Sequence, residues 1–196
     1  MIYHNYLEML LGSRVKVKIL RTLCRHRGKE FTVRELADFL DVSHMGVRKA
    51  LNDLYEMNAV RVRVIGKSHT IALNAESYAA NLADKTFKME EETLGELVKL
   101  LGRRLSGPTT VSVLIFGSIA RGEEEPLSDI DLFILTEDKE KAEVAVSELQ
   151  GEVSRRFGNA ISPYILSGED LADKDKVQIL EEIQRKHLVV CGKPLE

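Results

Sequence analysis

The chain has 196 residues, of which 44% are hydrophobic and 30% are charged, and its formal net charge at pH 7 is −3. This is the composition of a globular protein with one large or two small domains, and no apolar run approaches the roughly 20 residues that a transmembrane helix needs. The first residues lack the features of a signal peptide, and the two cysteines stand far apart, so we expect a cytoplasmic protein with no disulfide framework and no membrane partner.

The charge is unevenly distributed along the chain. Residues 1–74 contain 13 Lys and Arg against 7 Asp and Glu, a balance of +6, whereas the remainder has 15 against 24, a balance of −9. A basic segment attracts a polyanion, and an acidic segment repels one unless a metal ion or a local arginine intervenes. We therefore expect the two halves to have different functions.

The basic half begins with two predicted helices. Apolar residues recur at helical spacing over residues 14–26, which predicts the first. Thr32, followed three residues later by Glu35, predicts a capping box at the start of the second. A tight turn at Asp41-Val42 then ends this second helix.

A third helix and a β-hairpin follow. Ser43 can cap the third helix, in which Val47, Leu51 and Leu54 form the buried stripe and leave polar and basic side chains outside. Residues 60–65, VRVRVI, then alternate apolar and basic side chains, and residues 69–73 return after a turn. This pattern predicts a hairpin with a basic tip.

The helices and hairpin, over roughly residues 12–74, resemble the winged helix-turn-helix domains of prokaryotic transcription regulators. The resemblance implies that double-stranded DNA is a partner and that the domain regulates transcription. It implies major-groove positions for Ser43, His44, Arg48 and Asn52, with Lys49 beside them on the exposed face, and phosphate or minor-groove positions for Arg61, Arg63 and Lys67. Winged helices also dock proteins or form dimers, so an antitoxin-like protein-binding module and a homodimer stay open.

A phosphate-binding segment is predicted in the acidic half. The apolar run Val111–Phe116 predicts a buried strand that ends at Gly117 and Ser118, where small residues let a ligand approach the backbone closely. Residues 118–121 predict a short helix, whose first N–H groups are available to an anion such as a triphosphate. Arg121 adds a positive charge nearby.

A pair of carboxylates follows this segment. Asp129 and Asp131 lead into the apolar residues 132–135, so they stand at the start of a second strand. Strand side chains alternate, and the spacing therefore points both carboxylates to the same side. Two converging carboxylates without a basic partner suit a hard divalent cation. We expect Mg²⁺, or Mn²⁺ in place of Mg²⁺.

The pattern G-S-x-A-R-G, a short acidic loop and S-D-I-D-L, in this order between two apolar strands, resembles the signature of the polymerase-β-type nucleotidyltransferase superfamily in its minimal form. The resemblance implies a metal-binding and catalytic pair at Asp129 and Asp131. It implies a nucleoside triphosphate bound at Gly117, Ser118, Arg121 and Ser128.

One part of that superfamily's pattern is missing. The resemblance implies a third carboxylate on a later strand, where it would complete a two-metal site. The matching segment, residues 160–166, contains no acid, and Ser162 or Tyr164 stands where an Asp is expected. Glu169 or Asp170 could supply the third carboxylate only if a bent loop brought it back beside Asp129 and Asp131. The sequence therefore leaves open whether the protein is an enzyme.

We expect an α+β protein of two domains. A winged helix-turn-helix of three helices and a hairpin at 1–74 is followed by a helical connector at 75–106, broken near Lys85 or Gly95, and by an α/β nucleotidyltransferase-like domain with a small mixed sheet at 107–196. The leading hypothesis is a DNA-binding transcriptional regulator whose second domain binds a nucleoside triphosphate with Mg²⁺. The alternative is an active nucleotidyltransferase that transfers a nucleoside monophosphate to a hydroxyl of protein, RNA or a small molecule.

Overall fold

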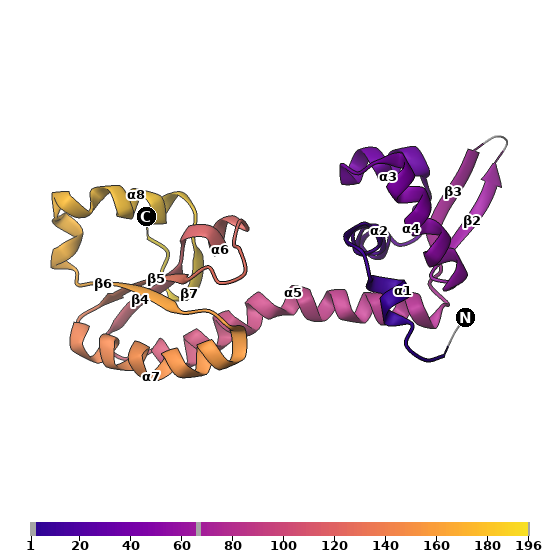
Figure 1. The fold of residues 1–196 in the computed structure, drawn as a ribbon. Coiled ribbons are helices and arrows are strands. Elements are labelled where there is room, and N and C mark those ends of the chain that lie inside the picture. Colours follow the sequence, from indigo (N-terminus) through magenta and orange to yellow (C-terminus); the bar gives the residue numbers. More distant parts are fainter. Residues whose placement is uncertain (1–2, 66–67, 196) are drawn as a thin grey trace. The chain divides into compact units, whose positions relative to one another are not determined.

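The structure, a computed structural model, describes residues 3–65 and 68–195. The chain divides into two compact units, Met1–Glu92 and Thr93–Glu196, which meet inside the long helix α5 (Tyr78–Leu105). The expected fold class is confirmed, because helices and a hairpin precede a unit built on a small mixed sheet (Figure 1). No helix among the described residues combines the length and the apolar character needed to cross a bilayer.

The first unit contains the predicted helices and hairpin together with two short elements that the sequence did not predict. Its elements are α1 (Leu7–Leu11), α2 (Arg14–Arg25), β1 (Phe31–Thr32), α3 (Val33–Leu40), α4 (His44–Glu56), β2 (Val60–Ile65) and β3 (Ser68–Leu73). The predicted capping box is present, since Glu35 N–H donates to Thr32 Oγ1 at 3.2 Å and Thr32 N–H donates to Glu35 Oε2 at 2.6 Å. The strands form an antiparallel sheet in the order β1-β3-β2.

Helix α5 is continuous, so the break predicted near Lys85 or Gly95 is wrong. The beginning of the helix packs Ala79, Ala83 and Phe87 into the core of the first unit, and its end packs other side chains into the core of the second unit. Burial on both sides of Gly95 outweighs the cost of about 1 kcal/mol that a glycine imposes inside a helix.

The second unit is a four-stranded sheet in the order β6-β5-β4-β7. Strands β5 and β6 are parallel and the other pairs are antiparallel, which makes the sheet mixed as expected. Its elements are β4 (Thr110–Ile115), α6 (Gly117–Arg121), β5 (Ile130–Thr136), α7 (Lys139–Phe157), β6 (Ile161–Leu166), the 3₁₀ turns η1 (Glu169–Ala172) and η2 (Lys174–Lys176), α8 (Val177–Arg185) and β7 (Leu188–Gly192).

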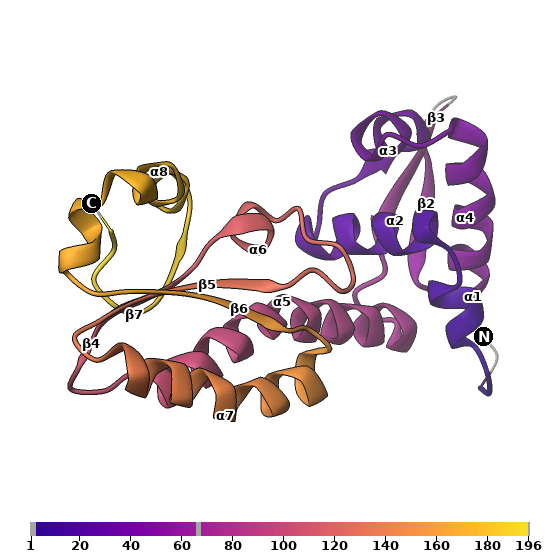
Figure 2. The same cartoon turned by 60° about the vertical axis from the view of Figure 1, so that its left-hand side comes forward.

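Helices cover both faces of this sheet (Figure 1, Figure 2). The end of α5 and all of α7 pack on one face, where Leu101, Leu149 and Val153 are buried against strand side chains. Helix α8 packs on the other face through Ile183, against Phe133 and Leu114. The connection from β4 to α6 and the start of β5 carry the predicted site.

Candidate functional site

Gly117 joins the two halves of the predicted motif. It begins α6 directly after β4, and its φ of +68° is one that other residues rarely adopt. A Cβ atom at this position would overlap the carboxylate of Asp131. The neighbouring Phe116 N–H donates to the carbonyl of Asp131 at 3.0 Å. The residue that opens the predicted phosphate-binding turn therefore lies directly against one of the two predicted metal ligands.

The two aspartates stand at the start of β5, as the sequence predicts. Asp129 is exposed and precedes the strand, and Asp131 is half-buried within it. Burial raises the pKa of Asp131, and the negative charge of Asp129 raises it further. Two carboxylates that repel each other in this way match the oxygen ligands of a divalent cation.

Strand β6, where the resemblance implies a third carboxylate, contains no acidic residue. In the parallel register of β5 and β6, Asp131 lies opposite Ser162, which is exposed, and Phe133 lies opposite Tyr164. Over the described residues, no three or more His, Cys, Asp or Glu side chains are grouped so that they could hold a metal ion. The protein therefore supplies two carboxylates, and further ligands would come from water or phosphate oxygens.

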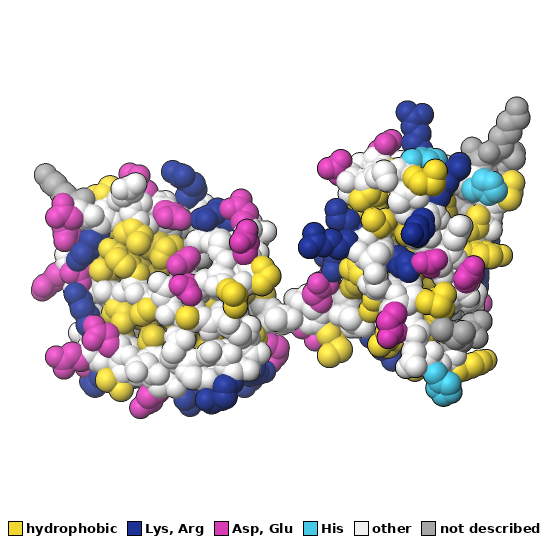
Figure 3. Space-filling model, in the orientation of Figure 1, with side chains coloured by type: hydrophobic (Ala, Val, Ile, Leu, Met, Phe, Trp, Pro, Cys, Tyr) yellow, Lys and Arg dark blue, Asp and Glu magenta, His cyan; other side chains and the backbone are white. Residues whose placement is uncertain are grey.

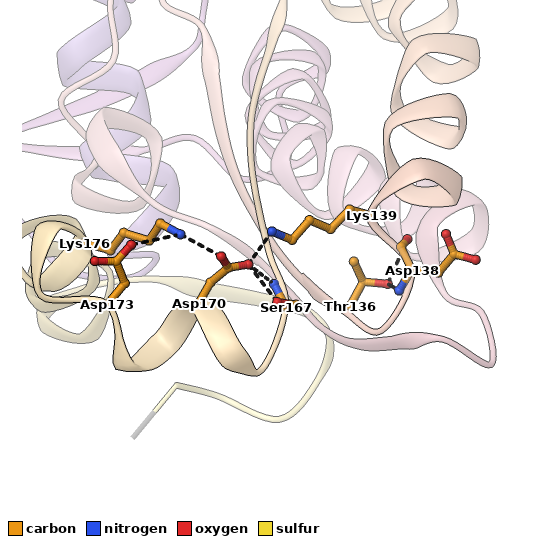
Figure 4. Close-up of polar contacts among 7 residues, drawn as sticks. All are labelled: Thr136, Asp138, Lys139, Ser167, Asp170, Asp173 and Lys176. Atoms are coloured by element: carbon orange, nitrogen blue, oxygen red, sulfur yellow. Dashed lines mark hydrogen bonds and ion pairs between the residues drawn. The ribbon is translucent and has the colours of Figure 1, made fainter.

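Asp170 does not return toward Asp131. Figure 4 shows its carboxylate between Lys139, at the start of α7, and Lys176, which donates to it at 2.7 Å. The carboxylate also accepts hydrogen bonds from the backbone N–H and the hydroxyl of Ser167. Because β5 and β6 are parallel, this cluster beyond the end of β6 lies at the opposite end of the strands from Asp131. These ion pairs hold the pKa of Asp170 well below its usual range.

Ser128 and Arg121 both have partners within the protein. Ser128 closes the turn that begins at Glu125, because its N–H donates to the Glu125 carbonyl and its Oγ accepts from the Glu125 N–H, each at 2.9 Å. Arg121 donates to the carboxylates of Glu123 and Glu182. Glu182, on α8, was not found from the sequence because only tertiary packing brings it to α6.

The exposed face of α4 has the composition predicted for it. The helix begins at Ser43, whose Oγ accepts from the Gly46 N–H at 3.1 Å. The side chains predicted to face DNA are all exposed: Ser43, His44, Arg48, Lys49 and Asn52. Arg48 and Asn52 also line a groove of about 640 Å³ between α4 and the hairpin, together with Tyr55, Val62, Val64 and His69 among others.

The hairpin presents different chemistry on its two faces. Val62 and Val64 line the groove beside α4, whereas Arg61 and Arg63 line a separate pocket on the other face. The two arginines are also paired, Arg61 with Glu76 at 2.7 Å and Arg63 with Glu30 at 3.1 Å. The structure therefore does not bring them together with Arg48. The predicted contact Lys67 lies outside the described residues.

Carboxylates in the first half of α5 and just before it reduce the positive charge of the first unit. These carboxylates form ion pairs with arginines at Arg61–Glu76, Arg27–Asp84, Arg21–Glu90 and Arg25–Glu91. Arg48 and Lys49, by contrast, have no ion pair within the part of the chain that the structure describes. Figure 3 shows basic and hydrophobic side chains interspersed on the visible face of this unit. The unpaired positive charge of α4 thus lies beside an apolar groove.

Solved structures with partial similarity include a toxin–antitoxin with AMP-PNP, which is 19% identical over 52% of this chain and 74% of that chain, with a TM-score of 0.37. NolR from Sinorhizobium fredii is 19% identical over 46% of this chain and 81% of its own, with a TM-score of 0.38. The transcriptional regulator BldR from Sulfolobus solfataricus is 19% identical over 50% and 81%, with a TM-score of 0.35. No curated protein matches the sequence.

The sequence profile of the nucleotidyltransferase domain matches residues 94–191. The match includes the turn at Gly117, both aspartates, strands β4, β5 and β6, and β7 except its last residue. It covers half of the chain, and the protein therefore belongs to the nucleotidyltransferase domain family.

Proposed function

We propose that the second unit binds a nucleoside triphosphate together with Mg²⁺ and that the first unit binds double-stranded DNA, so that the protein is a nucleotide-responsive transcriptional regulator. The observation that carries the nucleotide site is the contact of Gly117 with Asp131. Phosphate oxygens that approach the backbone at Gly117 are thereby brought beside the two carboxylates. Membership of the nucleotidyltransferase domain family supports the same assignment.

The residues of this site have separate roles in the proposal. Asp129 and Asp131 would hold the cation, which supplies the positive charge that lets phosphates and carboxylates share one pocket. Gly117 and Ser118 would let the phosphates approach the backbone closely, since neither has a bulky side chain. Because Ser162 rather than an acid faces Asp131, no carboxylate of β6 is placed to take a proton from an attacking hydroxyl. We therefore propose binding with little or no nucleotidyl transfer.

Thermal unfolding tests the proposed site. A Mg²⁺-triphosphate that binds only the folded protein should raise the midpoint of unfolding of the full chain. Asp129→Ala combined with Asp131→Ala should abolish the rise. The matched control, Glu124→Ala with Glu125→Ala, removes two exposed carboxylates from the loop that precedes β5 and should keep the rise. An equal rise in the aspartate double variant would contradict the site.

A protein-docking role of the first unit is a second candidate. It is favoured by the exposure of large apolar side chains on both walls of the α4–hairpin groove, 60% for Tyr55 and 67% for Val64. A DNA surface and a docking surface respond differently to salt, because only the first depends on counterion release. Absence of salt-sensitive DNA binding by the full chain would favour the docking role.

A further inference from the structure

Arg121 is held by two carboxylates at the end of α6. Its Nε donates to Glu123 Oε2 at 2.8 Å, and its Nη1 donates to Glu182 Oε1 at 3.0 Å. Glu123 is two residues further along the chain, whereas Glu182 comes from α8. Lys186, just beyond α8, donates to the Arg121 carbonyl at 3.4 Å. Glu182 and Lys186 therefore both join the end of α8 to Arg121 on α6.

Two donor nitrogens of the guanidinium that could meet a phosphate, Nε and Nη1, are thus already bonded to carboxylates. A carboxylate and a phosphate present equivalent oxygens to the N–H groups of arginine, so the two compete for the same donors. Arg121 lies three residues beyond Ser118 on α6, a rise of about 4.5 Å along the axis. That separation is within reach of an arginine side chain and a bound triphosphate.

We propose that Glu182 is a positioning residue that occupies Arg121 in the nucleotide-free protein, and that a nucleoside triphosphate displaces it. The inference rests on the proposed nucleotide site. Displacement breaks the Arg121–Glu182 contact and keeps the contact of Lys186 with the Arg121 carbonyl. It also leaves the Glu182 carboxylate without the arginine, and the negative charge of Glu182 then repels that of Asp131. The contact therefore weakens triphosphate binding and links phosphate occupancy to the attachment of α8.

The prediction depends on phosphate number. A triphosphate that takes the Nη1 donor of Arg121 breaks the ion pair with Glu182, whereas a monophosphate that stops at the start of α6 leaves it in place. An exposed ion pair contributes modestly, so its removal should change the dissociation constant about two- to fivefold. A general loosening of the fold would instead change the binding of both ligands.

Calorimetric titration of the full chain with ATP and with AMP, each with Mg²⁺, tests the inference. Glu182→Gln should lower the dissociation constant of ATP about two- to fivefold and leave that of AMP unchanged. The matched control is Glu181→Gln, an adjacent exposed residue on the same helix, and it should change neither. If the original protein binds ATP but Glu182→Gln fails to strengthen that binding, the inference is overturned while the proposed function stands. If the original protein does not bind ATP, both are overturned.

Hydrogen exchange provides a second readout that does not depend on a variant. Binding of ATP should speed exchange of the backbone amides at the end of α8, because the Arg121–Glu182 contact is lost. AMP should not have this effect. Slower exchange across α8 with ATP would show that the contact persists or tightens, which contradicts displacement.

Discussion

At the scale of single residues, Gly117 bears directly on the nucleotide site. Gly122, at the other end of α6, offers a natural comparison. Both glycines have a positive φ, +68° and +73°, but a Cβ at Gly122 would meet nothing within 4 Å, whereas one at Gly117 would overlap the Asp131 carboxylate. The two positions therefore share the backbone requirement and differ in the close contact.

Replacement of each glycine by alanine separates these two effects. Gly122→Ala should lower the free energy of unfolding by about 1–2 kcal/mol, the cost of a left-handed backbone. Gly117→Ala should add about 1–3 kcal/mol for the overlap and should displace Asp131 from the site. Urea unfolding and nucleotide titration measure the two quantities. Equal stabilities and equal nucleotide affinities in the two variants would show that the contact has no role.

Asp131 should make the ligand-free protein less stable as the pH rises. Its pKa is raised in the folded state, so the folded protein binds the proton more tightly than the unfolded chain, and stability falls as pH increases through that raised pKa. Asp131→Asn should consequently increase the free energy of unfolding at pH 7 without metal, and should have little effect below the ordinary Asp pKa of about 3.9. Urea unfolding at both pH values checks the sign.

The same variant should lose Mg²⁺-dependent nucleotide binding at every pH, because an amide is a poorer ligand for the cation than a carboxylate. Glu124→Gln, in the loop that precedes β5, is the control for a simple change of net charge. A destabilised Asp131→Asn protein at pH 7 would mean that Asp131 has favourable partners in the fold that outweigh its repulsion by Asp129.

At the scale of elements, the division of the hairpin into two faces decides which arginines can act together on DNA. Arg48 is unpaired within the described residues and lies on the exposed face of α4, whereas Arg61 lies on the far face of the hairpin and pairs with Glu76. The two arginines should therefore contribute differently to binding of a polyanion.

Arg48→Ala should weaken DNA binding and reduce the slope of log affinity against log salt concentration by about 1, the value for loss of one phosphate contact. If Arg48 reads a base, the variant should also relax sequence preference. Arg61→Ala, the matched control, should leave the slope nearly unchanged because its charge is already compensated by Glu76. Fluorescence anisotropy with duplex DNA at several salt concentrations measures both. A larger loss in Arg61→Ala would place the binding surface on the other face of the hairpin.

Local patterns in the sequence were sufficient to predict most of the helices and strands. Thr32 and Glu35 fix the start of α3 through their own hydrogen bonds, and the alternation of residues 60–65 separates the arginines from Val62 and Val64. Which face of the hairpin turns toward α4 depends on packing, which a strand's alternation does not contain. The continuity of α5 likewise depends on burial in two cores, which its local sequence does not reveal.

At the scale of the whole molecule, the boundary between the two units lies after Glu92, well beyond the end of the hairpin at Leu73. Asp84 is nearly buried and accepts from Arg27 at 2.6 Å and Lys88 at 2.9 Å, and Phe87 lies in the core of the first unit. A fragment that ends at Asn74 lacks these residues, whereas one that ends at Glu92 retains them. We expect the fragment 1–92 to unfold cooperatively and to be more stable than 1–74 by about 3 kcal/mol or more, the cost of losing a buried Phe. Equal stability of the fragments, measured by urea unfolding, would contradict this boundary.

The family and the mixed sheet could be predicted because their signals are local, a Gly-Ser turn and two aspartates between apolar strands. The partners of these residues could not. Parallel pairing of β5 with β6 places Ser162 opposite Asp131, and the packing of α8 brings Glu182 to Arg121. Both contacts join residues far apart in sequence, so they follow from topology rather than from any short pattern.

The central claim is that the second unit binds a nucleoside triphosphate without transferring it. Incubation of the full chain with a triphosphate labelled in its α-phosphate, with Mg²⁺ or Mn²⁺, tests both parts in one measurement. The protein should retain the label non-covalently, and Asp129→Ala with Asp131→Ala should abolish retention. Little or none should pass to protein, RNA or small acceptors, because base assistance, typically worth ~10²–10⁴-fold, is missing at Ser162. Covalent transfer of the label by the original protein, lost in Asp131→Ala, would contradict the claim and establish an active nucleotidyltransferase.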